Sequence, residues 1–332
     1  MNGNNPSRFQ QAHRRGFFAS TAVAGASALA GANMLTNSTA HATSPAVANS
    51  DSVSLRYCLN TSTINGSKVP LREQLQIAAK AGYDSVELWL RDIEKYLGSG
   101  GTLTNLASEL EDLGLSVESA IAFGAWIADD DAARMAGLDQ CRKDMETLAA
   151  IGGKRIAAPP KGATDLPKLD LDRAAERYHA LLEVGADVGV LPQLELWGFS
   201  KNLSTLQEIL YVAAASGHPD ACILLDVYHM YKGGNDFNNV GLIPASKMFC
   251  LHMNDYPADP PRETIGDADR VYPGDGVAPL DRILKTLVAG GFSGTLSLEL
   301  FNRSYWKLPP LDVASTGLAK MKAAVDSALG SA

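Results

Sequence analysis

The 332-residue chain contains only four cysteines, Cys58, Cys141, Cys222 and Cys250, and no two of them form a C-x-x-C pair. This scarcity argues against a structural zinc site, which is usually built on paired cysteines. Cys58, Cys222 and Cys250 lie in short apolar runs, so we expect them to be small core residues. The spacing selects no disulfide partner for any of them.

An excess of basic residues is also missing. The formal charge is −8, and no basic stripe interleaved with aromatic residues occurs, so nucleic acid is not an expected partner. The chain has no G-x-G-x-x-G turn, which argues against a doubly wound dinucleotide-binding sheet. With 46% hydrophobic and 20% charged residues, the composition is that of an ordinary globular protein with a large core.

The N-terminal segment differs in character from the rest of the chain. The twin arginines Arg14 and Arg15 precede a weakly apolar, alanine-rich stretch, and the triplet Ala40-His41-Ala42 matches an A-x-A cleavage site. We therefore predict a Tat-type signal peptide over residues 1–42, with export to the periplasm and a mature N-terminus near Thr43.

The same stretch could instead be an ordinary helix or a membrane anchor. It carries Ser, Thr, Gly and Asn and is too short and too polar to make a good spanning helix. We expect no stable membrane insertion after cleavage.

Residues 43–52 form a polar linker, and strand and helix patterns alternate from residue 53 to about residue 330. Strands are predicted near 53–59, 84–90, 115–122, 154–159, 191–197, 221–227, 247–253 and 295–301. Helices are predicted over 70–81, 102–113, 131–151, 170–189, 203–216, 278–290 and 311–328, with a short one near 236–243. Eight such alternating units predict an α/β fold, a single-domain (β/α)8 TIM barrel over residues 53–330. An open doubly wound sheet is the alternative.

Four successive strand-like runs end in a polar side chain of the same parity: Glu195, Asp226, His252 and Glu299. In Thr295-Leu296-Ser297-Leu298-Glu299-Leu300 the leucines alternate with polar residues, and side chains alternate faces along a strand. The same holds for the other three runs, so the four polar side chains can share the barrel interior. Because the C-terminal strand ends of a parallel barrel lie side by side, we expect the four to meet there.

Three carboxylates and one imidazole suit one divalent cation. The absence of a thiolate favours Mn²⁺ or Mg²⁺, while Co²⁺ and Zn²⁺ remain acceptable to the same donors. We predict Glu195, Asp226, His252 and Glu299 as the metal ligands. Four unrelated polar residues at strand ends would be the alternative interpretation.

Four further residues are predicted to contact substrate. His229 follows Asp226 by three positions and could lean over the metal as a neutral hydrogen-bonding group. Arg270 precedes the tight turn Pro273-Gly274-Asp275-Gly276 and could donate to a substrate oxygen. Glu87 has the inward parity in its own strand. Asp255 begins the seventh loop and could alternatively orient His252.

The ordered set Glu195, Asp226, His252 and Glu299, together with His229 and the segment from Arg270 to Gly276, resembles the sugar phosphate isomerase/epimerase family. That family has a xylose isomerase-like TIM barrel, and the resemblance covers about residues 53–328. It implies that Glu195 and Glu299 are both ligands and acid–base groups, and that the substrate is a small carbohydrate. Relatives are often dimers or tetramers, so the resemblance also makes a homo-oligomer an expectation.

The chain departs from the family after Glu195, where Trp197-Gly198-Phe199 stands in place of a segment that often carries Asn or His. Export is a second departure, since many relatives are cytoplasmic. The sequence therefore predicts a metal-dependent isomerase or epimerase of a keto sugar or related polyol, acting by proton abstraction through an enediolate. A metal-dependent dehydratase of a keto-cyclitol or 3-dehydroshikimate-like substrate is the alternative, and a non-catalytic sugar-binding barrel is a third.

Overall fold

A computed structural model describes residues 55–66 and 68–330. The predicted signal peptide and linker over residues 1–42 and 43–52 lie outside these residues. Within the described residues, no helix is long and apolar enough to cross a membrane.

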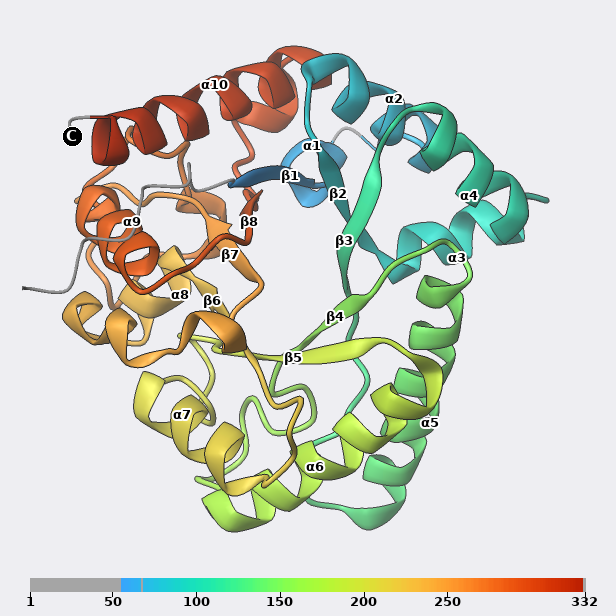
Figure 1. The fold of residues 1–332 in the computed structure, drawn as a ribbon, viewed down its shortest axis with the longest axis vertical. Coiled ribbons are helices and arrows are strands. Elements are labelled where there is room, and N and C mark those ends of the chain that lie inside the picture. The colour runs from blue at the N-terminus through green and yellow to red at the C-terminus, as the bar shows by residue number, and fades with distance from the viewer. Residues whose placement is uncertain (1–54, 67, 331–332) are drawn as a thin grey trace, which may run out of the picture. The chain divides into compact units, whose positions relative to one another are not determined.

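Eight parallel strands form a nearly closed barrel, as the sequence predicted (Figure 1). The strands are β1 Arg56–Asn60, β2 Ser85–Trp89, β3 Ser116–Ile121, β4 Arg155–Ala158, β5 Leu191–Glu195, β6 Ile223–Asp226, β7 Cys250–Met253 and β8 Thr295–Leu298. Their order is β3-β2-β1-β8-β7-β6-β5-β4, with β3 and β4 side by side where the sheet closes. All eight predicted strands are present, each a few residues shorter than its apolar run.

Helices surround the barrel (Figure 1). They are α1 Ser62–Asn65, α2 Leu71–Ala81, α3 Leu90–Gly98, α4 Leu103–Asp112, α5 Asp131–Ala149, α6 Leu171–Val188, α7 Leu206–Ala215, α8 Val227–Lys232, α9 Leu280–Ala289 and α10 Pro310–Leu329. The seven longer predicted helices are confirmed. The segment near 236–243 is a 3₁₀ helix, Phe237–Leu242, while α1, α3 and α8 were not predicted.

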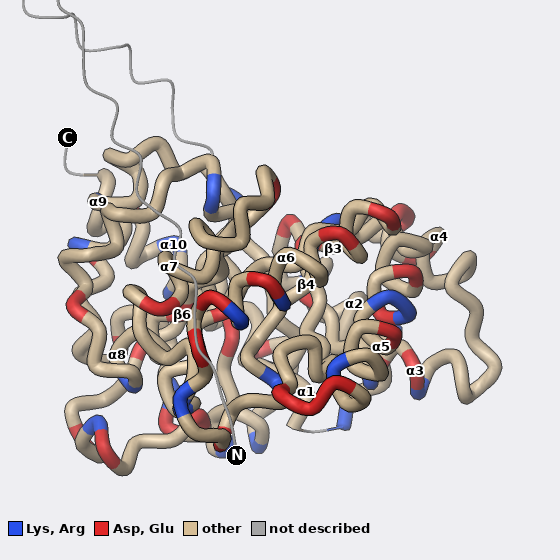
Figure 2. The backbone as a smooth tube through the Cα atoms, turned by 90° about the horizontal axis from the view of Figure 1, so that it is seen from below, with Lys and Arg blue, Asp and Glu red and all other residues tan. Residues whose placement is uncertain are grey.

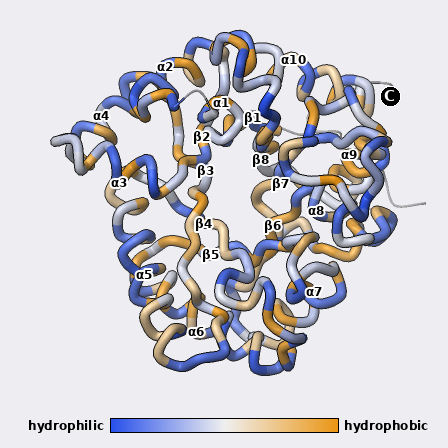
Figure 3. Tube along the Cα trace, turned by 180° about the vertical axis from the view of Figure 1, so that it is seen from behind, coloured by the Kyte–Doolittle hydropathy of each residue, from blue (hydrophilic) through white to orange (hydrophobic). Residues whose placement is uncertain are grey.

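Amphipathic helices account for the outer layer. In Figure 3, α2 and α10 carry both hydrophobic and hydrophilic segments, and their apolar residues join the outward-facing strand residues in one core. Leu194 and Leu225 belong to this core, each preceding a polar residue that faces the interior. Figure 2 shows acidic and basic residues interspersed over the surrounding helices and loops.

The barrel interior is closed by a small second cluster that contains Trp89, Ile121, Ala157, Leu224 and Cys250. Small and polar residues fill the space around it. The barrel interior is therefore filled by side chains, as in other TIM barrels.

Candidate metal and substrate site

The four predicted ligand residues converge on one imidazole nitrogen. His252 Nδ1 lies 3.3 Å from Glu299 Oε2, 3.7 Å from Asp226 Oδ2 and 3.9 Å from Glu195 Oε1. All four side chains are buried, with exposed fractions of 0–4%. Asp226, His252 and Glu299 each offer one donor atom within 4.8 Å of the others, as a shared cation requires. The strand ends thus bring Asp226, His252 and Glu299 into one cluster, and Glu195 approaches His252 Nδ1 without belonging to that cluster.

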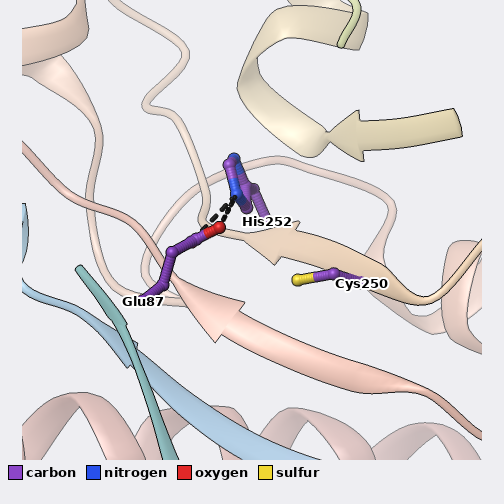
Figure 4. Close-up of side chains that lie close together, drawn as sticks. All are labelled: Glu87, Cys250 and His252. Carbon is purple, nitrogen blue, oxygen red and sulfur yellow. Dashed lines mark hydrogen bonds and ion pairs between the residues drawn. The ribbon is translucent and has the colours of Figure 1, made fainter. Parts of the chain in front are cut away.

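The Nδ1 atom of His252 faces these carboxylates. Its Nε2 lies 3.0 Å from Glu87 Oε2, and the carboxylate can only accept, so Nε2 carries a proton (Figure 4). Burial opposes a charge on the ring, but Glu87, Glu299 and Asp226 raise the pKa of His252 well above its ordinary value, so Nδ1 also carries a proton when no cation is bound. This buried Nδ1 has no hydrogen-bond partner among the described residues, and a cation that replaced its proton would find one nitrogen facing three carboxylates.

Glu87 Oε2 accepts from two further donors, Asn60 Nδ2 and Ser297 Oγ, both at 2.8 Å. The predicted contact of Glu87 with substrate is not tested by these bonds. They do show that its carboxylate is surrounded by donors of the protein itself and holds His252 in place. The sequence analysis did not select Asn60, although it ends β1 as Glu195 ends β5 and Asp226 ends β6.

A second potential cation site faces the other side of His252. Glu87, Cys250 and His252 also place donor atoms within 4.8 Å of one another (Figure 4). Burial and the nearby Glu87 carboxylate raise the pKa of the Cys250 thiol well above its ordinary value, so sulfur stays protonated. Since the Nε2 proton is also committed to Glu87, the Nδ1 side suits a cation better.

Asp226 and Glu299 accept hydrogen bonds on both of their oxygens, and one oxygen of each also faces His252 Nδ1. Asp226 Oδ1 accepts from His229 N at 2.8 Å, which caps α8, and Glu299 Oε1 accepts from Asn60 Nδ2 at 3.1 Å. Glu195 makes no side-chain hydrogen bond within the described ranges. The site therefore contains two fixed carboxylates and one free carboxylate.

Arg270 is buried in the site rather than at its surface. Its Nη1 donates to Asp226 Oδ2 and to Glu299 Oε2, both at 2.8 Å, and its Nη2 donates to Asp267 Oδ1 at 2.7 Å. Arg270 and His252 hold the pKa of Asp226 well below its ordinary value despite burial. Arg270 therefore bridges the same two carboxylate oxygens that face His252 Nδ1.

The charges of the site leave room for a dication. Glu87, Glu195, Asp226 and Glu299 are all buried, and the buried Arg270 guanidinium pairs with two of them, Asp226 and Glu299. Without a bound cation, burial and the neighbouring acids raise the pKa of Glu195 to about 8. A buried carboxylate that cannot find a positive partner takes up a proton instead. A divalent ion beside it would restore the ionised form.

His229 is buried and neutral. Burial lowers its pKa to about 4, and Arg270 Nη2 lies 3.2 Å from its Nε2. Because a guanidinium only donates, Nε2 accepts and Nδ1 carries the proton. That Nδ1–H has no partner among the residues described, so it is a free donor beside the site.

Asp255 organises the loop that delivers Arg270. Its Oδ2 accepts from Gly274 N and Gly276 N at 3.0 and 3.1 Å, and its Oδ1 accepts from Tyr256 N and Ala278 N at 2.7 and 2.8 Å. A Cβ on Gly276 would stand 2.3 Å from Asp255 Oδ1, so the turn needs glycine there. Both carboxylate oxygens of Asp255 are occupied by this loop, and no contact with His252 is present.

Asn254 was also overlooked. It follows His252 by two positions, and its Nδ2 donates to Asp226 Oδ2 at 2.9 Å. The parity that selected His252 could have selected Asn254, which is fully buried.

Comparison with known proteins identifies the family of the fold. Residues 75–324 match the profile of the family described as xylose isomerase-like TIM barrel. An inosose isomerase from Halalkalibacterium halodurans is 27% identical over 267 residues, which cover 79% of this chain and 93% of that protein. A 3-dehydroshikimate dehydratase from Pseudomonas putida is 23% identical, covering 76% of this chain and 39% of that protein.

Solved structures share the fold. A crystal structure of the IolI protein with a bound zinc atom has a TM-score of 0.76 at 23% identity and covers 83% of this chain and 99% of that one. A structure of L-ribulose 3-epimerase has a TM-score of 0.67 at 20% identity, covering 84% and 98%.

Proposed function

The chain belongs to the xylose isomerase-like TIM barrel family, and we propose that it is a metal-dependent isomerase or epimerase of a keto sugar or related polyol. The observation that carries the proposal is the unpartnered Nδ1 of His252, which faces Glu195, Asp226 and Glu299 within 3.9 Å. The relatives named inosose isomerase and L-ribulose 3-epimerase support the reaction class.

Glu195, Asp226, His252 and Glu299 would hold the cation. The donor set of three carboxylates and one imidazole favours Mn²⁺ or Mg²⁺, while Co²⁺ and the zinc seen in the IolI protein are compatible with it. When bound, the metal supplies Lewis-acid polarisation of the substrate carbonyl.

Two glutamates supply the proton chemistry. Glu195 accepts no hydrogen bond from the described residues, and a cation bound beside it would keep it ionised, as a general base requires. Glu299 is held by Arg270 and Asn60 and is the second acid–base group. One glutamate removes the carbon-bound proton to give an enediolate, and the other returns a proton to the opposite face or the neighbouring carbon.

Arg270 and His229 position the substrate and the acids. Arg270 keeps Asp226 and Glu299 close together against their mutual repulsion. The Nδ1–H of His229 donates to a substrate oxygen without changing its charge over the neutral pH range.

A dehydratase is the second candidate. It uses the same proton abstraction, after which a β-hydroxyl leaves as water with help from His229 or Arg270. The similarity to a 3-dehydroshikimate dehydratase, which covers 39% of that protein, supports the dehydratase reaction. The two reactions differ in product, since only elimination creates an enone that absorbs ultraviolet light.

The test is an exchange screen in deuterium oxide. Protein loaded separately with Mn²⁺, Mg²⁺, Co²⁺ or Zn²⁺ is incubated with free keto sugars, and NMR follows deuterium entering at the carbon next to the carbonyl, while ultraviolet absorbance follows elimination from a dehydroshikimate-like substrate. Exchange is expected with at least one sugar. No exchange and no enone with any metal would refute the proposal.

Glu299→Gln separates chemistry from binding. We expect turnover to fall by roughly 10²–10⁴-fold while metal analysis still finds the ion. Glu118→Gln is the matched control, because Glu118 is buried at the opposite end of the barrel beside Arg155 and Thr295. Retained turnover in Glu299→Gln would refute the proposal that Glu299 is an acid–base group.

A further inference from the structure

Three aromatic side chains form a row beside the candidate site. The ring centroids of Phe123 and Trp197 are 6.0 Å apart, and those of Trp197 and Phe199 are 5.0 Å apart. Phe123 and Phe199 are 40% and 45% exposed, and adjoining exposed aromatic side chains, unlike single ones, often mark a binding site. Trp197 lies two positions beyond Glu195, the last residue of β5.

The row also touches the free donor of the site. The ring of His229 lies 5.5 Å from Phe199 and 6.4 Å from Trp197, centroid to centroid. His229 is 3% exposed, and its Nδ1 has no partner within the described part of the chain. A buried polar group with an unused proton beside exposed aromatic faces points to a ligand that brings both a hydroxyl and an apolar face.

The loop that presents Phe199 is fixed in place. Trp197 N donates to Leu203 O at 3.1 Å, and Lys201 N donates to Thr164 O at 2.8 Å in the neighbouring loop. Asn202 Nδ2 donates to Ala163 O at 2.7 Å, which ties the two loops together a second time. The exposure of Phe199 is therefore held by the backbone on both sides of it.

Gly198 sets the position of this loop against α8. A Cβ at Gly198 would lie 2.2 Å from His229 O and 2.6 Å from Gly233 N. Only glycine permits this close approach. Because the loop is already rigid, ligand binding at Phe199 loses less conformational entropy than binding at a flexible loop would.

We propose that Phe123, Trp197 and Phe199 form a second subsite, which binds the apolar face of a sugar ring joined by a glycosidic bond to the sugar that reacts at the ligand cluster. The inference rests on the proposed function and names its substrate class, a glycoside of a keto sugar rather than a free monosaccharide. The C–H groups of a sugar ring pack against the negative face of an aromatic ring, and His229 donates to a hydroxyl at the junction of the two sugars.

Trp89 does not belong to this subsite. Its ring is 6% exposed and packs against Phe123 and Phe301, with centroids 5.6 and 5.9 Å away. The Arg91 guanidinium lies 4.0 Å from the ring centroid, and Trp89 Nε1 donates to Asn60 Oδ1 at 2.9 Å. The rings of Phe123 and Phe199 are therefore the aromatic surfaces that a ligand can contact.

The test compares fructose with three glycosyl fructoses, lactulose, turanose and isomaltulose, by calorimetric titration of the metal-loaded protein. At least one glycosyl fructose is expected to bind roughly tenfold more tightly than fructose, and Phe199→Ala is expected to remove most of that gain while leaving fructose unchanged. Tyr211→Ala is the matched control, since Tyr211 is likewise 45% exposed but lies on α7, where it bonds Asp172.

Two results would overturn the subsite. One is that no glycosyl fructose binds more tightly than fructose to the unaltered protein, a comparison that needs no variant. The other is that folded Phe199→Ala, checked by circular dichroism, binds every sugar as the parent does. Deuterium exchange is measured separately, so persistent exchange with either result would reject the subsite and leave the proposed function standing.

Discussion

Replacing Glu87 with glutamine is expected to weaken metal binding without touching a metal ligand. Glu87 accepts from His252 Nε2, Asn60 Nδ2 and Ser297 Oγ, so three donors meet one fully buried carboxylate. Glutamine offers a single acceptor oxygen, and its amide would place a donor against at least one of these donors. The orientation of His252 and the basicity of its Nδ1 both depend on this carboxylate.

Loss of such a carboxylate partner typically costs 10–100-fold in metal affinity. This corresponds to roughly 1.4–2.7 kcal/mol of binding free energy. We expect Glu87→Gln to fall within or above this range, because the amide adds a donor–donor conflict to the lost charge.

The assay is competition for Mn²⁺ or Zn²⁺ against a chelator of known affinity, at fixed pH and ionic strength. Glu118→Gln makes the same substitution at the amino-terminal end of the barrel, where Glu118 bonds Arg155 and Thr295. It should alter stability but not metal affinity. Equal affinities for Glu87→Gln and the parent would refute the reasoning that His252 is held through Nε2 for coordination through Nδ1.

Three other expectations follow from separate parts of the molecule. Burial raises the pKa of Asp144 to about 6, so the folded protein keeps a proton that the unfolded chain has lost, and the free energy of unfolding falls as pH rises from about 4 to 6. Asp144→Asn should abolish this fall and so be up to about 3 kcal/mol more stable than the parent in urea unfolding at pH 7.5, with no gain at pH 4. Asp255→Asn leaves one acceptor oxygen for four backbone donors and should lower the free energy of unfolding by roughly 3 kcal/mol. Turnover should also fall, because the loop that positions Arg270 would shift. An unchanged urea midpoint would contradict the stability prediction. We propose that the native protein is periplasmic and begins near Thr43, and N-terminal sequencing that returns Met1 would reject the signal peptide.

The sequence predicted the barrel because local patterns decide most of it. Apolar runs of alternating parity specify which face of a strand meets the helices, as Leu194 and Leu225 do in the core. Each strand is shorter than its predicted run, because only the residues that pair with a neighbouring strand count as strand. Helix α3 was overlooked because Trp89 leads directly into it with no polar capping residue.

The convergence of Glu195, Asp226, His252 and Glu299 was also predictable, because a parallel barrel makes strand ends neighbours. Asn60 and Asn254 could have been found by the same parity. The burial of Arg270 could not, because its bonds to Asp226 and Glu299 span 44 and 29 positions and depend on a long loop. That loop is shaped by Asp255, whose role depends on four backbone donors that no local pattern reveals.

The placement of Arg270 has a consequence for the metal-free protein. A guanidinium that bonds both Asp226 and Glu299 acts as a permanent internal counter-ion, so these acids need not spread apart or protonate when the metal leaves. Glu195 and His252 then have to adapt, each by binding a proton. The demetallated barrel should stay folded, and metal uptake near neutral pH should release about two protons for each ion bound.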